Sequence, residues 1–192
     1  MIDFLEVSVL DEAGCERLRA EVRQADGSAA GLLGHSRPVE RVRKVARAKI
    51  PSATCARVMR LLLQQKPALE HHFGVTLGDC EKPRFLRYQT GDFFVAHQDG
   101  NTPLIHGASR FRKISAVIFL SAQSAEPQPA TYGGGSLVLH GPYSGPPQKV
   151  PVAPPPGTLV AFRAETTHEV APVTHGERVT IVSWFREPAP SP

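Results

Sequence analysis

The stretch Phe93-Phe94-Val95-Ala96-His97-Gln98-Asp99-Gly100 decides the architecture expected for this chain. Its aromatic and β-branched residues, bounded by glycines on both sides, are typical of a short β-strand. Successive side chains of a strand point to opposite faces, so His97 and Asp99 project to the same side and Gln98 faces away. The sequence therefore predicts an imidazole and a carboxylate within reach of one metal ion.

The chain after Gly78 is a series of short apolar runs broken by Gly, Pro and Asn. Short strands at fairly regular spacing are typical of a β-sandwich or β-barrel. The triplet Gly133–Gly135 is too short and wrongly placed for a phosphate-binding loop, and it predicts a β-turn before a strand. The predicted strands are Phe85–Tyr88, Phe93–His97, Ile114–Leu120, Ser136–His140, Lys149–Val152, Thr158–Arg163, His168–Val170 and Arg178–Phe185.

The residues before this region have a different pattern. Apolar residues spaced at nearly helical period predict an amphipathic helix over Leu10–Asp26, followed by a loop over Gly27–Gly34. The basic segment Arg41–Ile50 predicts a strand with one exposed basic face. A second helix is expected to follow, capped by Ser52 and interrupted or kinked at Pro67.

These elements together predict an α+β fold with a double-stranded β-helix (jelly roll) core and N-terminal helices packed on one sheet. A chain of 192 residues is expected to form a single domain, residues 1–192. Residues 1–80 would be a helical support with one or two early strands. Residues 81–188 would be the catalytic jelly-roll core.

Composition restricts the location and the partners. The cysteines Cys15, Cys55 and Cys80 are widely spaced and odd in number, which favours neither a disulfide framework nor a zinc site but a reducing cytoplasm. The sequence contains neither a secretory signal nor an apolar run of the ~18 residues that a membrane span needs, so we expect no membrane association. A net charge of +4 is too mild to favour specific nucleic-acid binding.

A second imidazole and a guanidinium complete the metal hypothesis. His168 begins a later predicted strand, and Arg178 begins the strand after it. Two imidazoles and one carboxylate form the facial triad of non-haem Fe(II) oxygenases, which leaves three octahedral positions open. An arginine nearby can hold the far carboxylate of a dicarboxylate that chelates the metal. The alternative is a surface histidine beside an aspartate in a turn.

Other candidate side chains have weaker support. Tyr88 precedes His97 on the previous predicted strand, and its hydroxyl either lines the barrel mouth or is satisfied within the core. His106 lies close enough to the loop after Asp99 to contact a substrate. The remaining histidines are expected to be structural or exposed, and they are His35, His71, His72, His140 and His175.

From Phe85 to Glu187 the chain resembles the Fe(II)- and 2-oxoglutarate-dependent dioxygenases of the prolyl hydroxylase type. The bacterial PKHD-type hydroxylases and the animal oxygen-sensing prolyl hydroxylases are the most similar branches. The segments that carry the resemblance are Arg87–Gly100, Arg112–Ser121, Tyr132–Leu137, Pro156–Val160 and His168–Trp184.

The resemblance implies a role for each matched position. His97, Asp99 and His168 would be the iron ligands, Arg178 would bind the C5 carboxylate of 2-oxoglutarate, and Tyr88 would line the co-substrate pocket. Trp184 would be the family's aromatic on the last core strand. Two positions differ between branches: Phe119 lies where the oxygen-sensing branch has a co-substrate-binding tyrosine, and collagen-type members have lysine in place of Arg178.

The implied activity is hydroxylation of an unactivated C–H bond, with conversion of 2-oxoglutarate and O2 to succinate and CO2. The implied cofactors are Fe(II), 2-oxoglutarate as co-substrate, O2 and ascorbate. The expected substrate is a prolyl residue in a peptide or protein, and Arg41–Lys49 could help an acidic polypeptide to dock. A free amino acid, a natural product, nucleic-acid demethylation and a non-catalytic metal-binding sensor remain alternatives. No oligomeric state is predicted.

Overall fold

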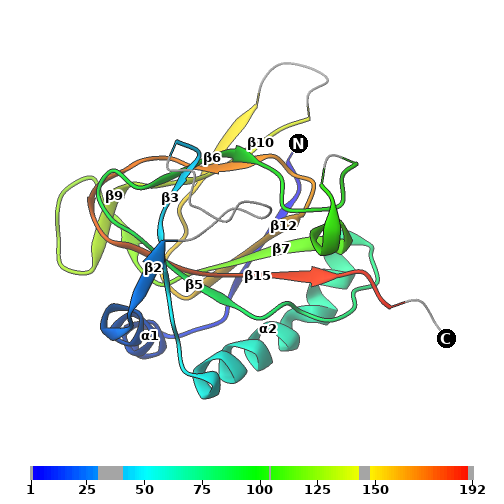
Figure 1. Ribbon diagram of the computed structural model, residues 1–192, viewed down its shortest axis with the longest axis horizontal. Coiled ribbons are helices and arrows are strands. Elements are labelled where there is room, and N and C mark those ends of the chain that lie inside the picture. The colour runs from blue at the N-terminus through cyan, green and yellow to red at the C-terminus, as the bar shows by residue number, and fades with distance from the viewer. Residues whose placement is uncertain (1, 30–40, 104, 143–147, 190–192) are drawn as a thin grey trace.

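Two antiparallel β-sheets face each other in the computed structural model, which describes residues 2–29, 41–103, 105–142 and 148–189 (Figure 1). The larger sheet has the strand order β1 (Phe4–Ser8), β12 (Thr158–Arg163), β7 (Arg112–Phe119), β15 (Arg178–Arg186), β5 (Arg84–Tyr88), β4 (Ala46–Ala48) and β2 (Gly27–Ala29). The smaller sheet has the order β11 (Lys149–Val152), β10 (Leu137–His140), β13 (His168–Val170), β6 (Phe93–His97) and β3 (Arg43–Lys44).

A third, three-stranded sheet is formed by β14 (Val173–Gly176), β9 (Thr131–Gly134) and β8 (Ala122–Gln123), in that order. The eight strands predicted after Gly78 are all present, and each begins and ends within two residues of its predicted bounds. The predicted jelly-roll architecture is confirmed. The structure adds β1, β2, β8, β9 and β14, which the sequence pattern did not indicate.

Side-chain alternation in the central strand β7 separates two hydrophobic clusters. Ile114, Ala116 and Ile118 belong to a cluster that includes residues of both helices, α1 (Glu12–Gln24) and α2 (Ser52–Phe73). Val117 and Phe119 point to the opposite face and pack with residues of the smaller sheet. Because both faces of β7 are covered, every residue from Ile114 to Phe119 is buried. The helices contact the outer face of the larger sheet, and the inner face is left for the site.

Helix α1 begins after Asp11, whose carboxylate accepts a 2.7 Å hydrogen bond from the Gly14 amide. Helix α2 differs from its prediction at two points. Pro51 occupies the N-cap position and no side chain caps the helix, so Ser52 is its first residue and not its cap. Pro67 lies on the exposed face and does not interrupt the helix, which continues to Phe73.

The segment Arg41–Ile50 was predicted as one strand, but it forms two short strands, because it crosses between the two large sheets. Its first half, β3, pairs with β6, and its second half, β4, pairs with β5. Val45 lies between them and is buried. Arg43 is buried rather than part of an exposed basic face, because the crossing turns its side chain toward the interior.

Three further expectations need correction. The predicted loop Gly27–Gly34 begins with strand β2, and its residues from 30 onward lie outside the described residues. Together with β1, β3 and β4 this gives four short strands before residue 80, where one or two were expected. The predicted turn at Gly133–Gly135 is shifted, because β9 includes Gly133 and Gly134. The positive φ angles of 61° at Gly134 and 60° at Gly135 mark the true turn.

No helix in the described ranges is long and apolar enough to cross a membrane. Cys15, Cys55 and Cys80 are all free.

Candidate active site

A cavity of about 740 Å³ opens between the two large sheets, within the size range of small-molecule sites. Its walls come from β5, β7 and β15 of the larger sheet and from β6 and β13 of the smaller one. His97, Asp99, His168, Arg178 and Tyr88, the five residues predicted to form the site, all line it. The fold therefore brings together residues that are up to 90 positions apart in the sequence, as the register of Tyr88 opposite Arg178 shows.

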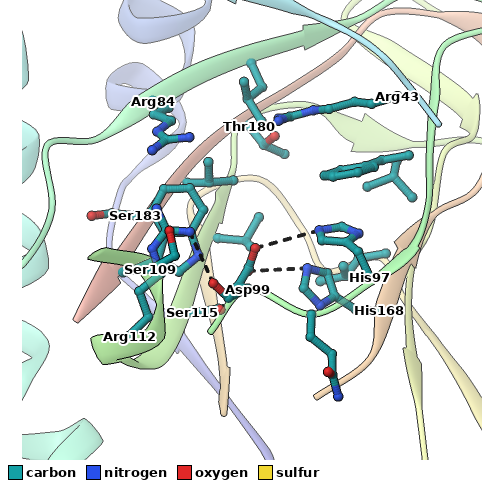
Figure 2. Close-up of a pocket in the computed structure, with 18 of the residues that line it drawn as sticks. Arg43, Arg84, His97, Asp99, Ser109, Arg112, Ser115, His168, Thr180 and Ser183 are labelled. Carbon is teal, nitrogen blue, oxygen red and sulfur yellow. Dashed lines mark hydrogen bonds and ion pairs between the residues drawn. The ribbon is translucent and has the colours of Figure 1, made fainter. Parts of the chain in front are cut away.

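The candidate metal ligands meet at the rim of the smaller sheet (Figure 2). His97 ends β6, His168 begins β13, and the two residues are directly opposite in the antiparallel register. Asp99 follows β6 and places one carboxylate oxygen 3.7 Å from His97 Nε2 and the other 3.4 Å from His168 Nε2. One ligand atom from each residue lies within 4.8 Å of the other two. This spacing allows all three side chains to coordinate one ion.

Backbone carbonyls orient both imidazoles. Nδ1 of His97 lies 2.9 Å from the Val95 carbonyl oxygen, and Nδ1 of His168 lies 2.9 Å from that of Thr166. A carbonyl oxygen only accepts hydrogen bonds, so each Nδ1 must carry the proton and donate it. The lone pair of each Nε2 is then free to face the centre of the cluster, which is the arrangement that a metal-binding histidine needs.

Asp99 is fixed by two hydrogen-bond donors. The Ser115 hydroxyl donates to its Oδ2 at 2.8 Å, and the Trp184 side chain donates a second hydrogen bond. Burial raises the pKa of Asp99, but the nearby His168 and His97 and the two donors lower it to about 2. Burial, followed by repulsion from His168, lowers the pKa of His97 to about 3. At neutral pH the cluster thus holds an ionised carboxylate beside a neutral His97, the states that bind metal.

Arg178 lies deep in the same cavity and is 1% exposed. Its guanidinium lies 5.1 Å from the centre of the Tyr88 ring and 5.0 Å from that of Phe119. Its Nη1 donates a hydrogen bond to the Thr180 hydroxyl at 3.3 Å, its buried Nε has no partner, and no acidic side chain within the described residues pairs with it. An uncompensated buried cation is costly, so this site favours an anionic ligand.

Residues 83–186 match the 2OG-Fe(II) oxygenase superfamily, which is more than half of the chain. The chain belongs to this superfamily. Among its relatives, a PKHD-type hydroxylase of Janthinobacterium sp. (strain Marseille) is 33% identical over 106 residues, and one of Burkholderia lata is 36% identical over 106 residues. Each alignment covers 54% of this chain and 42% of the relative, so the chain spans less than half the length of these curated proteins.

Solved structures with the same fold include a prolyl-4-hydroxylase of Pseudomonas putida, with a TM-score of 0.74, 24% identity, and coverage of 98% of this chain and 95% of that one. A prolyl hydroxylase of Trichoplax adhaerens, in complex with a peptide fragment of the hypoxia inducible factor oxygen degradation domain, has a TM-score of 0.72 and 18% identity. That alignment covers 96% of this chain and 83% of the other. Both alignments cover nearly the whole chain, which shows that it shares the fold of these proteins.

Two tyrosines lie beside Arg178. Tyr88 lines the cavity but also belongs to a hydrophobic cluster with Val45 and Leu86, so its ring has a packing role whatever its hydroxyl does. Tyr132 is fully buried and does not line the cavity, but it lies beside Arg178. Burial raises the pKa of Tyr132, whereas the adjacent Arg178 opposes that shift. The phenylalanine at position 119 therefore does not leave Arg178 without a neighbouring hydroxyl.

Four residues of the cavity wall were not predicted from the sequence. Ser115 and Thr180, which bind Asp99 and Arg178, had no predicted role, nor did Arg84, and Arg43 was expected on an exposed face. No local signal marks these side chains, because each is an ordinary strand residue whose position depends on strand pairing. His106 does line the cavity, as anticipated. His72 and His140 pair instead with Asp3 and Glu169, outside the cavity.

Proposed function

We propose that this protein is an Fe(II)- and 2-oxoglutarate-dependent dioxygenase that hydroxylates an unactivated C–H bond. One observation carries the proposal: the three side chains of a facial triad line one cavity together with a buried arginine that has no acidic partner among the described residues. His97, Asp99 and His168 would hold the iron, because two imidazoles and a carboxylate suit Fe(II) and leave positions open for other ligands. Arg178 would bind the C5 carboxylate of 2-oxoglutarate.

The protein's own groups would orient the reactants and exclude water. Bound iron, with 2-oxoglutarate and O2, supplies the oxidising chemistry, in which one oxygen atom enters succinate and the other enters the substrate as a hydroxyl group, with release of CO2. Arg178 suits the C5 carboxylate because a guanidinium stays charged when buried and can donate two parallel hydrogen bonds. Ser115 and Trp184 would keep Asp99 in place during the reaction. Tyr88 would complete the co-substrate pocket.

The proposed substrate is a prolyl residue in a peptide or protein. Support comes from the PKHD-type relatives and from two neighbours in structure that are prolyl hydroxylases, one of them bound to a peptide. Ascorbate is proposed as an accessory reductant. We also propose that residues 81–188 are the catalytic core, that residues 1–80 support it within one domain, and that the free cysteines reflect a cytoplasmic location.

Anaerobic reconstitution tests the proposal directly. Addition of Fe(II) and 2-oxoglutarate to the protein should produce the weak visible charge-transfer band of the metal-bound keto acid. Admission of O2 should then yield succinate, and mass spectrometry of prolyl peptides should detect a gain of about 16 Da, the mass of one oxygen atom. A protein that binds Fe(II) but shows neither the band nor succinate would instead be a non-catalytic metal-binding module.

A further inference from the structure

The cavity has more positive charge than the proposed chemistry uses. Four arginines line it, Arg43, Arg84, Arg112 and Arg178, whereas Asp99 is the one acidic residue among its described lining residues. Arg178 is assigned to 2-oxoglutarate under the proposed function. The contacts of the other three arginines show whether the protein itself neutralises their positive charge or whether that charge is available to bind a ligand.

Arg112 is neutralised by the protein. Its Nε and Nη2 donate 2.8 Å hydrogen bonds to the two carboxylate oxygens of Glu81, in a bidentate ion pair. Arg84 depends on the same carboxylate and lies 3.8 Å from the oxygen that already accepts from Arg112. Glu81 also lies 3.4 Å from Arg186, so one carboxylate is shared by three guanidinium groups and compensates Arg84 only in part. Burial and repulsion by Arg112 lower the pKa of Arg84 to about 10.

Arg43 has no acidic partner within the described residues. Its side chain is 9% exposed, and its buried Nε has no hydrogen-bond acceptor. The guanidinium lies 4.5 Å from the centre of the Phe94 ring, but a ring face does not satisfy its N–H groups. In Figure 2, the guanidinium groups of Arg43 and Arg84 lie on either side of Thr180, on the same side of the metal cluster.

The stacking of Phe94 places this charge close to the metal cluster. Its ring stacks on the His97 imidazole with a centroid distance of 3.5 Å and an interplanar angle of 20°. Arg43, Phe94 and His97 thus form one continuous stack from the cavity wall to a metal ligand. An anion bound by Arg43 would lie close to the atoms that react at the metal.

We propose that Arg43 and Arg84 form a second carboxylate subsite, which binds a carboxylate of the substrate itself. The inference rests on the proposed function and narrows its substrate class to compounds with a carboxylate a few bonds from the oxidised C–H. Two sources share this chemistry: the α-carboxylate of a free amino acid, and an acidic side chain next to a prolyl residue in a peptide.

Two matched pairs of compounds test this subsite and distinguish the sources. The full chain is loaded anaerobically with Fe(II) and saturating 2-oxoglutarate, so that Arg178 is occupied. L-proline is compared with L-prolinamide, and a capped Pro-Glu peptide is compared with the same peptide containing Pro-Gln. Binding is measured from the change that each compound causes in the charge-transfer band. In at least one pair, the carboxylate compound should bind about tenfold more tightly than its amide.

Variants then test which arginines cause the preference for the carboxylate compound over its amide. Arg43→Gln and Arg84→Gln should each remove it and leave the affinity for 2-oxoglutarate unchanged. Arg47→Gln is the matched control, because Arg47 lies in the same basic segment but does not line the cavity. Equal affinity within both pairs, including no detectable binding of all four compounds, would overturn the subsite. So would a loss of 2-oxoglutarate affinity in Arg43→Gln. The charge-transfer band of the wild type would persist in either case, and its absence would count against the proposed function instead.

Discussion

Arg112 and Arg178 lie on adjacent strands of one sheet and line the same cavity, and they are 3% and 1% exposed, respectively. Arg112 donates two hydrogen bonds to Glu81 and one, at 3.3 Å, to the Asp99 carbonyl oxygen. Arg178 donates one hydrogen bond to a neutral hydroxyl, that of Thr180. Glu81 neutralises the first cation, whereas the second is buried with no acidic partner among the described residues.

The difference in partners indicates that Arg112 stabilises the fold, whereas Arg178 is available to bind a ligand. A buried ion pair with good geometry holds its neighbours in place, and removal of one partner costs several kcal/mol because the other is left uncompensated. A buried cation without a partner weakens the free protein but is already desolvated and oriented for an anionic ligand. We therefore expect changes near Arg112 to act on folding and changes near Arg178 to act on binding.

The largest effect is expected at the cluster of candidate metal ligands, which lines the same cavity as these two arginines. Asp99→Ala removes the one charged ligand of the proposed iron site, and we expect turnover of 2-oxoglutarate to fall by about 10³-fold or more. Succinate formation at saturating Fe(II) measures the loss. Glu169→Ala, which removes an acid next to His168 but outside the cavity, is the control and should keep its activity. Coupled hydroxylation by Asp99→Ala would contradict the assignment of the triad.

Replacement of Arg178 tests whether this arginine binds 2-oxoglutarate. Arg178→Met keeps an apolar chain of similar length but removes the charge, and we expect the KM for 2-oxoglutarate to rise about 100-fold. Iron binding should be unchanged. The free energy of unfolding, measured by urea titration, should be equal to or higher than that of the wild type, because an unpaired buried cation is lost. An unchanged KM would remove the proposed role of Arg178.

Replacement of Glu81 tests whether its ion pair with Arg112 stabilises the fold. Glu81→Gln leaves Arg112 buried without a full charge partner, and we expect the free energy of unfolding to fall by about 3 kcal/mol. The KM for 2-oxoglutarate should change less than about twofold, since Arg178 is untouched. A large rise in that KM with unchanged stability would reverse the roles assigned to the two arginines.

The ion pair between Glu81 and Arg112 predicts that the free energy of unfolding depends on pH. Burial raises the pKa of Glu81, but the hydrogen bonds and charge of Arg112, with Arg186 and Arg84, lower it below the ordinary value of 4.5. The folded state then binds protons more weakly than the unfolded state, so the stability that this carboxylate contributes is present above pH 4.5 and is lost as the pH falls through the lowered pKa. The difference in stability between wild type and Glu81→Gln should therefore shrink below pH 4.5. A difference that stays constant down to pH 3 would contradict this linkage.

The smallest effect should distinguish the two hydroxyls beside Arg178. Loss of one neutral hydrogen bond to the co-substrate corresponds to about 0.5–1.5 kcal/mol, so Tyr88→Phe should raise the KM for 2-oxoglutarate about two- to tenfold. Tyr132→Phe is the matched variant, because Tyr132 is buried next to the same guanidinium but does not line the cavity. If Tyr132→Phe alone raises the KM, the role proposed for Tyr88 passes to Tyr132.

The sequence determined the elements that depend on neighbouring residues. Strand β6 begins and ends as predicted, and the two-residue period of a strand explains why His97 and Asp99 face the same side. The strands β11, β12 and β13 also match their predicted bounds. Apolar alternation and helical periodicity depend only on residues that are close together in the sequence, so they can be recognised without knowledge of the fold.

Only the tertiary structure decided the pairings between distant segments. The register that sets His168 opposite His97, the crossing of Arg43 into the interior and the position of Tyr132 beside Arg178 all depend on which strands become neighbours. Nor could it be predicted from the sequence that Arg112 forms an ion pair with Glu81, whereas Arg178 has no acidic partner among the described residues. Compensation of a buried charge is a property of three-dimensional proximity, because electrostatic energy depends on distance and burial and not on separation along the chain.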